Sequence, residues 1–479
     1  MRCSRSRSVV LAAAILACCG AVAAAGETAS GAATGAGAAG SSAAGTSAAS
    51  TAAAEARERT RQILAYGIDA QVLDVIERLR AARDADFTAE LAALLASSRS
   101  PDVRRSVLEL FTELGIGEGE TAARAIVAEW QTGDAGVTAA AAAYLASRRA
   151  DGLAAVLIPL VDADDAVVCS AALRAIGASR DPAAVEPLLA KLAAIEFPDA
   201  RKGDLVVALG ELRDARAVDA LLRIAKGRDE EKTRRLYAAD ALGKIGDRRA
   251  LPVLKALFEE DDALLRAYAA SALAAFGTGE ALPSLLAGLK DSNARVRVQC
   301  LKALARQLAP EEAAQVVPIV RWKAENDPER AVRLESVRTL GGIADAPSVE
   351  FLGTLLANRT AALDFREAAL SGLLARTPGS PAVAAAVEQE IAAKDQKPIE
   401  MIARVLSFAK ARELAPVWLR LLDCQGYTVR IWGVRGLAAN GIASALPRIG
   451  ELAEKDPVSA VRSEAARAKE RLAARSLSD

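Results

Sequence analysis

Residue types that commonly carry out catalysis are absent or scattered in this chain of 479 residues. It contains no histidine, which excludes a Ser-His-Asp triad, a histidine general base and the usual zinc ligand sets. Aspartate and glutamate total 61, but no two carboxylates stand apart as a local pair for acid–base work. We therefore expect a protein without catalytic residues, cofactor or bound metal.

Glycine and cysteine motifs do not predict a reactive site either. The stretch GIGEGE at 115–120 lacks the preceding strand and the Lys-Ser/Thr of a phosphate-binding loop, so we interpret it as a connection between helices. Beyond the first 25 residues the cysteines are Cys169, Cys300 and Cys424, which lie 131 and 124 residues apart. This odd number predicts no disulfide framework. Cys300 falls on a predicted core position, where a thiol acts as a small apolar group.

One position, most often arginine, recurs along the chain at a nearly constant interval. In order, it is occupied by Arg104, Thr138, Cys169, Lys202, Arg235, Arg266, Arg297, Arg333, Arg366, Met401, Arg430 and Arg462. A row of exposed arginines would form a stripe for an anionic polymer. Acidic residues precede most repeats, so we favour a ladder in which each arginine pairs with a carboxylate of its own or the neighbouring repeat. Basic and acidic residues number 61 each, which also argues against a nucleic-acid binder.

Apolar residues after each of these positions define a helix face. The gaps between successive positions are 34, 31, 33, 33, 31, 31, 36, 33, 35, 29 and 32 residues. Four residues later lie Leu108, Ala142, Leu173, Val206, Ala239, Ala270, Leu301, Val337, Leu370, Val405, Val434 and Ala466. Seven residues later lie Phe111, Leu145, Ile176, Leu209, Leu242, Leu273, Leu304, Leu340, Leu373, Phe408 and Leu437, then Lys469. This spacing is one face of an α-helix, repeated twelve times.

A short break and a second helix follow each of these first helices. In ALGKIGDRRALPVLKALFEED, at 241–261, the second helix has its own apolar stripe. Glycines near the breaks are interpreted as left-handed residues that end the first helix. They are Gly177, Gly210, Gly246, Gly277 and Gly441. Proline stands near the start of several second helices, where its missing N–H costs nothing.

A period of 30–36 residues built from helix pairs is typical of an α-solenoid. The phrases ALGKIGDRRALPVLKAL and VVALGELRDARAVDALLRIA resemble the short HEAT-type repeat, the variety also found in phycobilisome-lyase-like proteins. The resemblance covers residues 98–479 and implies an all-α superhelix of about twelve antiparallel helix pairs. Residues 57–97 are predicted to form a degenerate N-terminal pair, and the helix that breaks the pattern at Lys469 a C-terminal cap.

Tryptophan and arginine on predicted second helices are the candidate partner-binding residues. These are Arg321, Trp322 and Lys323 in VRWKAEND, and Trp418 and Arg420 in VWLRLLD. Trp and Arg are enriched among residues that anchor protein partners. The rival interpretation, which we favour, is that each tryptophan packs between helices. Trp432 lies on a first helix and is predicted to be structural.

Residues 1–25 have the pattern of a secretory signal peptide. Three arginines precede an apolar run over residues 9–19, and small residues follow. Cleavage would occur after Ala25; alternatively, ILAC at 15–18 resembles a bacterial lipoprotein box in which Cys18 is lipidated. Either route predicts the bacterial periplasm or cell envelope, with the membrane contacted only through a lipid at Cys18. Residues 26–56, rich in Ala, Gly and Ser, are predicted to be a flexible tether.

The predicted function is non-catalytic: a solenoid outside the cytoplasm that docks a protein partner on its repeat surface. Two alternatives stay open. One is a HEAT-like lyase acting on a tetrapyrrole-type ligand, although no tetrapyrrole-specific motif is found. The other is binding of nucleic acid or glycan polymers through the repeated arginines. The HEAT-repeat hydroxylases, whose iron is held by His-Glu pairs, are excluded by the absence of histidine.

Overall fold

The computed structural model of the protein describes residues 42–194, 201–306 and 308–476, and this part consists of helices and turns without strands. After α1 (Ser42–Tyr66), first and second helices alternate. The first helices are α2 (Asp69–Ala82), α4 (Pro101–Leu114), α6 (Ala135–Arg148), α8 (Ala166–Ser179), α10 (Lys202–Leu212), α12 (Lys232–Ile245), α14 (Ala263–Leu273), α16 (Ala294–Leu304), α18 (Arg330–Ile343), α20 (Leu363–Arg376), α22 (Gln396–Leu406), α24 (Tyr427–Ala439) and α26 (Ser459–Ser476).

The second helices are shorter on average, and several begin with a 3₁₀ turn. They are α3 (Thr88–Ser97), α5 (Glu120–Ala128), α7 (Leu153–Leu157), α9 (Val185–Ala193), α11 (Val218–Lys226), α13 (Leu251–Phe258), α15 (Thr278–Gly288), α17 (Pro310–Asn326), α19 (Ala346–Ala357), α21 (Pro381–Ala393), α23 (Ala415–Leu421) and α25 (Leu446–Lys455). The 3₁₀ turns are η1 (Ile158–Asp162), η2 (Pro182–Ala184), η4 (Ala215–Ala217), η5 (Arg248–Ala250), η6 (Ala274–Phe276), η7 (Arg412–Leu414) and η8 (Ala443–Ala445).

The chain divides into two compact units, residues 1–60 and 61–479. The described part of the first unit is the beginning of α1. The predicted flexible tether over 26–56 is therefore wrong from residue 42 onward, because this alanine-rich segment forms helix and alanine has the highest helix propensity. The rest of the tether, the predicted signal peptide at 1–25 and Cys18 lie outside the described residues.

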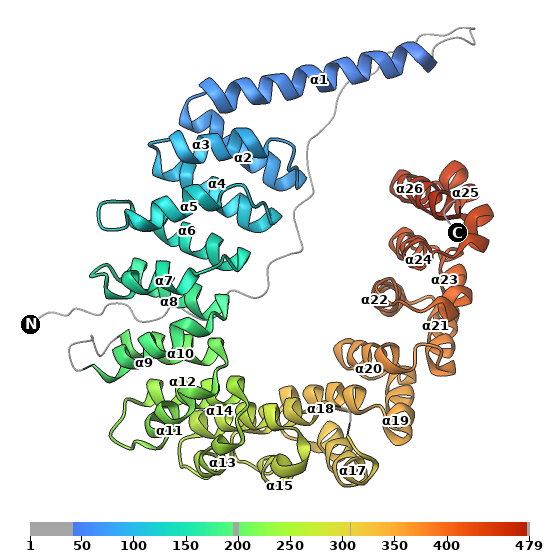
Figure 1. The fold of residues 1–479 in the computed structure, drawn as a ribbon. Helices are drawn as coiled ribbons and strands as arrows, with labels where there is room; N and C mark the ends of the chain where they lie inside the picture. Colours follow the sequence, from blue (N-terminus) through green and yellow to red (C-terminus); the bar gives the residue numbers. More distant parts are fainter. Residues whose placement is uncertain (1–41, 195–200, 307, 477–479) are drawn as a thin grey trace, which may run out of the picture. The chain divides into compact units, whose positions relative to one another are not determined.

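The second unit is the predicted solenoid of helix pairs. Within its described part, twelve pairs run from α2/α3 to α24/α25, and α26 closes the series. Each first helix packs against the next first helix and against the second helices beside it, as Figure 1 shows for the labelled elements. The degenerate pair expected at 57–97 corresponds to α2 and α3. The capping helix is α26, where Ala466 and Lys469 are exposed because no further pair covers them.

Small residues bring consecutive first helices close together. A Cβ atom added to Gly341 of α18 would lie 2.6 Å from the Cα of Gly372 on α20. One added to Gly243 of α12 would lie 2.7 Å from the Cα of Ala272 on α14. A larger side chain at either glycine would push the two helices apart. Ala269, three residues after the repeat position Arg266 in α14, is fully buried.

The glycines interpreted as helix ends serve two different purposes. Gly246, Gly277 and Gly441 do have positive φ angles, of 74°, 78° and 66°. Gly177 and Gly210 instead lie inside α8 and α10, each against the next first helix. For these two the prediction is wrong. The left-handed residues that end their helices are Arg180 and Arg213, with φ of 55° and 56°.

The register predicted for α22 is also wrong, by two residues. Val405 and Phe408 were placed in the core, but Val405 is half-buried and Phe408 is 73% exposed. The core positions are taken by Ala403 and Leu406, which are fully buried. The repeat position is therefore Ile399 rather than Met401, so the uneven gaps of 35 and 29 residues around it become 33 and 31. That regular spacing was the available signal.

Candidate functional site

The recurring arginines lie at the junctions between helix pairs, and five of the eight bind a backbone carbonyl and a carboxylate together. In α16, Nη1 of Arg297 donates to the carbonyl oxygens of Asp291 and Ser292, at 2.8 and 3.1 Å, in the turn before its own helix. Nε and Nη2 donate to the carboxylate of Asp327 after α17, at 3.0 and 2.8 Å. One guanidinium group thus binds the carbonyl oxygens of one turn and the carboxylate of the next junction.

The same arrangement recurs in neighbouring repeats. Arg266 donates to the carboxylate of Asp291 at 2.7 and 3.0 Å, and Arg430 to that of Asp456 at 2.8 and 2.9 Å. Each also donates to the two carbonyl oxygens that lie six and five residues before it. Because Asp291 receives Arg266 on its carboxylate and Arg297 on its carbonyl, the junctions form a continuous chain.

For five of the eight recurring arginines, the ladder confirms the pairing with carboxylates that we favoured. The arginines with a carboxylate partner are Arg235 with Glu260, Arg266 with Asp291, Arg297 with Asp327, Arg366 with Glu390 and Arg430 with Asp456. The side chains of all five arginines are at most 15% exposed. Buried and paired in this way, they cannot form a stripe for a polymer.

A neighbouring repeat supplies the missing arginine where Cys169 occupies the repeat position. Nη1 and Nη2 of Arg201 donate to the carbonyl oxygens of Ala163 and Asp164, at 2.5 and 2.6 Å. These are the same two turn positions that Arg266, Arg297 and Arg430 bind in their own repeats. The thiol of Cys169 donates to the carbonyl of Val161 at 3.3 Å. Burial raises the pKa of Cys169, and that of Cys300 to about 12, so both are structural thiols.

The three ladder aspartates, Asp291, Asp327 and Asp456, have pKa values below that of an ordinary aspartate. Burial alone would raise the pKa of Asp327, but the hydrogen bonds from Arg297, Lys323 and the backbone amide of Glu329 outweigh it and lower the pKa. The pKa values of Asp291 and Asp456 are lowered in the same way, by Arg266 and Arg430. These groups are therefore held as anions by the fold.

The predicted site residues on α23 do not form one surface. Trp418 is fully buried, so it packs between helices as the rival interpretation held, and it offers no surface to a partner. A Cβ atom added to Gly436 of α24 would lie 2.5 Å from its Nε1 atom. Arg420 is exposed and forms a bidentate ion pair with Glu388 of α21, at 2.8 and 3.0 Å.

The predicted residues on α17 do line a groove. Trp322 is 55% exposed and borders a cavity of about 520 Å³. The cavity is also lined by Val317 and Pro318 of α17 and by Pro347 of α19. Arg321 also borders this cavity, whereas Nζ of Lys323 turns to the ladder carboxylate of Asp327 at 3.0 Å. Of the three residues in VRWKAEND, the structure therefore brings two to the groove.

This groove continues between α17 and α19 on the other side of Arg321. A second cavity of about 370 Å³ is lined by Arg321 together with Phe351 and Phe365. The guanidinium carbon of Arg321 lies 5.3 Å from the centre of the Phe351 ring, a cation–π contact. We name this surface, bordered by Trp322, Arg321, Phe351 and Phe365, the α17–α19 groove. Sequence reasoning missed the two phenylalanines because they lie on later helices, Phe351 on α19 and Phe365 on α20.

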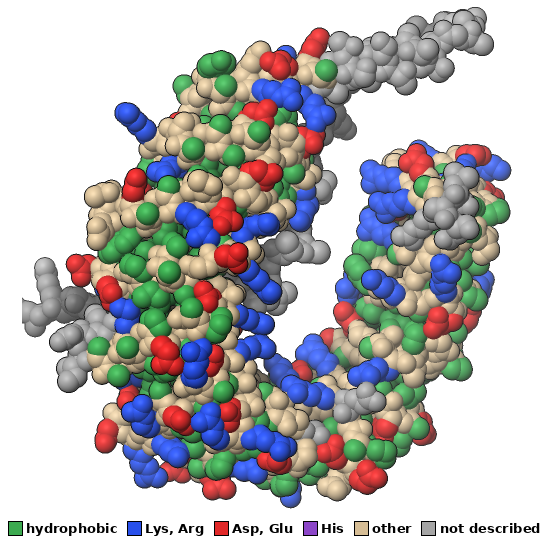
Figure 2. All heavy atoms as spheres, in the orientation of Figure 1, with side chains coloured by type: hydrophobic (Ala, Val, Ile, Leu, Met, Phe, Trp, Pro, Cys, Tyr) green, Lys and Arg blue, Asp and Glu red, His purple; other side chains and the backbone are tan. Residues whose placement is uncertain are grey.

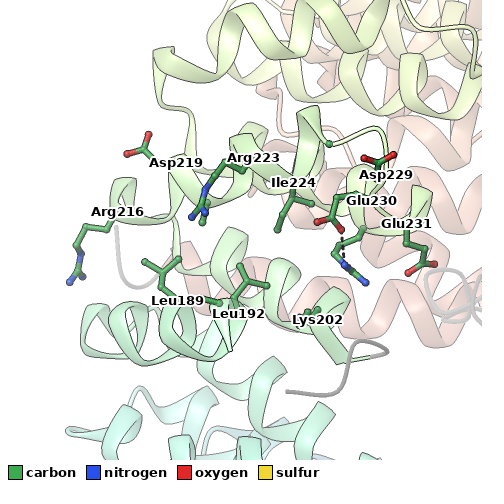
Figure 3. Close-up of a pocket in the computed structure, with 14 residues that line it drawn as sticks. Leu189, Leu192, Lys202, Arg216, Asp219, Arg223, Ile224, Asp229, Glu230 and Glu231 are labelled. Carbon is green, nitrogen blue, oxygen red and sulfur yellow. Dashed lines mark hydrogen bonds and ion pairs between the residues drawn. The ribbon is translucent and has the colours of Figure 1, made fainter. Parts of the chain in front are cut away.

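A larger cavity of about 940 Å³ lies between α9 and α11 (Figure 3). Leu189, Leu192 and Ile224 form its apolar wall, and charged residues stand at its rim. Leu192 and Lys202 flank residues 195–200, which lie outside the described residues, so we assign no site to this cavity. Elsewhere in the described ranges, no three His, Cys, Asp or Glu residues are grouped to hold a metal ion. Nor does any described helix combine the length and hydropathy needed to cross a membrane.

Comparison with known proteins identifies the repeat type. The family described as "Spirochaete HEAT repeat protein" matches residues 64–469. No curated protein matches the sequence. The solved structure of Kap121p is similar to this chain, with 12% sequence identity and a TM-score of 0.40; the match covers 86% of this chain and 53% of Kap121p. For Kap121p bound to Nup53p the identity is 14% and the TM-score 0.39, and the match covers 86% of this chain and 52% of that one. The CpcE–CpcF complex of phycocyanin lyase from Nostoc sp. PCC7120 matches with 20% sequence identity and a TM-score of 0.31. This match covers 60% of this chain and 94% of that one. This chain spans about half the length of Kap121p, and structural likenesses this weak do not bear on function.

Proposed function

Because the chain belongs to the spirochaete HEAT repeat protein family, we propose that it is a non-catalytic scaffold outside the cytoplasm that binds a protein partner on its repeat surface. The observation that carries the proposal is the α17–α19 groove. It combines an exposed tryptophan with an arginine and two further aromatic rings on packed helices. Residues of these types, fixed before binding, are those that anchor protein partners.

The repeat architecture supports the groove as a docking surface. Residue 322 lies only five residues before Asp327, the carboxylate that receives Arg297 and Lys323. The end of α17 is therefore tied to α16 by charged hydrogen bonds. A partner would meet a preformed surface and lose little of its binding free energy to ordering the groove.

The location outside the cytoplasm rests on the signal-peptide pattern of residues 1–25. Lipidation at Cys18 would hold the protein at a membrane surface, and cleavage after Ala25 would release it. Mass spectrometry of the N-terminal peptide from the native cell envelope tests both routes. A peptide beginning at Cys18 with added lipid mass supports the anchor, one beginning at Gly26 supports release, and an intact Met1 peptide would overturn the proposed location.

The docking proposal is tested by cross-linked capture of partners from the native envelope with full-length protein. Trp322→Ala is compared with Tyr66→Ala, which removes an aromatic ring that is 89% exposed on α1. We expect a stoichiometric protein partner to be captured by the wild type and by Tyr66→Ala, and to be lost with Trp322→Ala. Equal capture by Trp322→Ala would overturn the groove as the docking site.

The two alternatives have less support. Polymer binding through the repeated arginines requires exposed side chains, whereas those of the ladder face carboxylates and carbonyl oxygens in the junctions. The tetrapyrrole lyase alternative rests on the repeat resemblance, and no residue arrangement described above favours it.

A further inference from the structure

Charge is distributed unequally between the two sets of helices in the C-terminal half. There are 12 basic and 4 acidic residues in the first helices α16, α18, α20, α22 and α24. There are 3 basic and 6 acidic residues in the second helices α17, α19, α21 and α23. The basic residues of the first helices are Arg295, Arg297, Lys302, Arg330, Arg333, Arg338, Arg366, Arg376, Lys397, Arg404, Arg430 and Arg435. Four of these occupy the ladder position, and the other eight are exposed. Four of the exposed eight form ion pairs, namely Arg330 with Asp364, Arg338 with Glu335, Arg404 with Glu367 and Arg435 with Glu464. The other four, Arg295, Lys302, Arg376 and Lys397, have no ion pair within the described residues. The first-helix face is therefore basic.

Two cavities join along this face. One, of about 590 Å³, lies between α18 and α20, and the other, of about 550 Å³, lies between α20 and α22. They share Glu367, Ser371 and Ala375, so they form one depression across three first helices. Gly341 and Gly372, where α18 and α20 are in close contact, are among the residues that line it. In Figure 2, Lys and Arg side chains gather over the first helices near α18 and α20.

An aromatic pair, of which Phe408 is exposed and Trp432 is half-buried, stands at the α22 end of the depression. Phe408, just after α22, lines the second cavity and is 73% exposed. Its ring centre lies 6.1 Å from that of Trp432 on α24, and the guanidinium carbon of Arg435 lies 4.8 Å from the Trp432 ring centre. An exposed aromatic ring beside a tryptophan and an arginine combines residue types that anchor protein partners.

We infer that the first-helix face from α18 to α24 binds an extended, acidic protein segment that places an apolar side chain against Phe408 and Trp432. Exposed guanidinium and ammonium groups on successive helices suit carboxylates spaced along an extended chain. We call this surface the basic-aromatic face. It is separate from the α17–α19 groove, so either proposal can fail without the other.

The same face fits a nucleic acid less well. Asp364 and Glu367 line the depression among the basic groups, and Glu367 pairs with Arg404 at 2.9 Å. These carboxylates would repel a continuous row of phosphates, while an acidic peptide can place its own polar residues beside them. One aromatic pair also offers no series of stacking positions for successive bases.

The test measures binding of the purified full-length protein to a fluorescein-labelled peptide of alternating Glu and Asp with one central Phe. Probes for comparison are the same peptide with Gln and Asn in place of the acids, and an oligo-dT of equal length. The variants are Phe408→Ala and Lys410→Glu, since Lys410 lines the same cavity as Phe408. The matched control is Lys226→Glu on second helix α11. All three positions are exposed, so these changes leave the fold intact.

We expect the acidic peptide to bind at least roughly tenfold more tightly than the neutral peptide and the oligo-dT. Phe408→Ala and Lys410→Glu should each weaken this binding by about tenfold, and Lys226→Glu should leave it unchanged. The inference would be overturned if the neutral peptide or the oligo-dT bound as tightly as the acidic peptide. Equal weakening by Lys226→Glu, or none by Phe408→Ala, would also overturn it.

Discussion

Arg297 of α16 and Asp327 at the end of α17 form a bidentate ion pair whose side chains are 7% and 0% exposed. Removing two charges from water costs free energy, which the pair offsets only when its geometry is good and its other polar atoms are satisfied. Here the remaining donors of Arg297 bind two backbone carbonyls, and Asp327 also receives Lys323 and the backbone amide of Glu329. The junction is therefore vulnerable to the loss of either partner.

Arg297→Met should destabilise the protein strongly. The substitution leaves the buried carboxylate of Asp327 without its bidentate partner, and two turn carbonyls without donors. We expect the free energy of unfolding to fall by about 3–5 kcal/mol. Urea denaturation followed by circular dichroism measures this change. Arg295→Met, two residues earlier on the exposed face of α16, is the matched control and should change it by less than about 0.5 kcal/mol. Similar losses in both variants would show that the ladder arginine contributes no more to stability than an exposed arginine of the same helix.

The ladder carboxylates should make stability depend on acid pH. The folded-state pKa of Asp327 is lowered, so its contribution is complete above the unfolded-state pKa of about 3.9 and is lost as the pH falls through the lower folded-state value. Asp327→Asn should therefore be less stable than the wild type at pH 7, and the difference in unfolding temperature should shrink below about pH 4.

The control for this titration is Asp151→Asn, which removes an exposed carboxylate that has no ion pair within the described residues. Its unfolding temperature should follow the wild type at every pH. A wild-type advantage over Asp327→Asn that stayed constant from pH 7 to pH 2.5 would contradict the assigned role of the aspartate.

The repeat pattern predicted most of the fold because each helix pair buries the same face. Positions four and seven residues after Arg266 and Arg297 are fully buried, as the helical spacing requires. The pairing of these arginines was also predictable, since acidic residues stand before most repeats. Which carboxylate each arginine takes was not, because the partner lies one junction further along, after a second helix of variable length.

The candidate binding residues were less predictable because tryptophan suits both cores and interfaces. Trp418 and Trp322 follow similar local patterns, yet one is fully buried and the other is 55% exposed. The difference lies in Gly436, whose missing side chain makes room for Trp418 on the neighbouring helix. None of the glycines in the described ranges has Trp322 among its nearest neighbours. A signal of this kind becomes visible only when the packing partner is known.

Gly436→Ala should destabilise the junction of α23 and α24. The added methyl group would lie 2.5 Å from Nε1 of Trp418, and other atoms of the indole ring lie within 2.7 Å. Because Trp418 is fully buried, it cannot move aside without repacking, so we expect a loss of about 1–3 kcal/mol in the free energy of unfolding.

Gly279→Ala is the matched control for this substitution. Gly279 lies in α15, and a Cβ atom there meets nothing within 4 Å, so the helix propensity of alanine should stabilise the protein slightly or leave it unchanged. Chemical denaturation of both variants measures the contrast. A stable Gly436→Ala protein would mean that Trp418 is not packed as described.

Overpacking a fully buried alanine tests the repeat register in α14. Ala269→Leu adds three carbon atoms at a position with no exposed surface, next to the closely packed helices α12 and α16. We expect a loss of about 1–3 kcal/mol or more. Unchanged thermal unfolding of this variant would refute the register of the first helices.

The corrected register of α22 separates two residues that the sequence pattern had treated alike. Leu406 is fully buried, and Leu406→Ala should lower the free energy of unfolding by about 2–5 kcal/mol through lost burial and a residual cavity. Phe408 is 73% exposed, so Phe408→Ala should cost less than about 1 kcal/mol although it removes a larger side chain. Urea denaturation of the two variants measures both values. The reverse order, with Phe408→Ala the more damaging, would restore the register that begins at Met401 and would remove the exposed ring on which the basic-aromatic face depends.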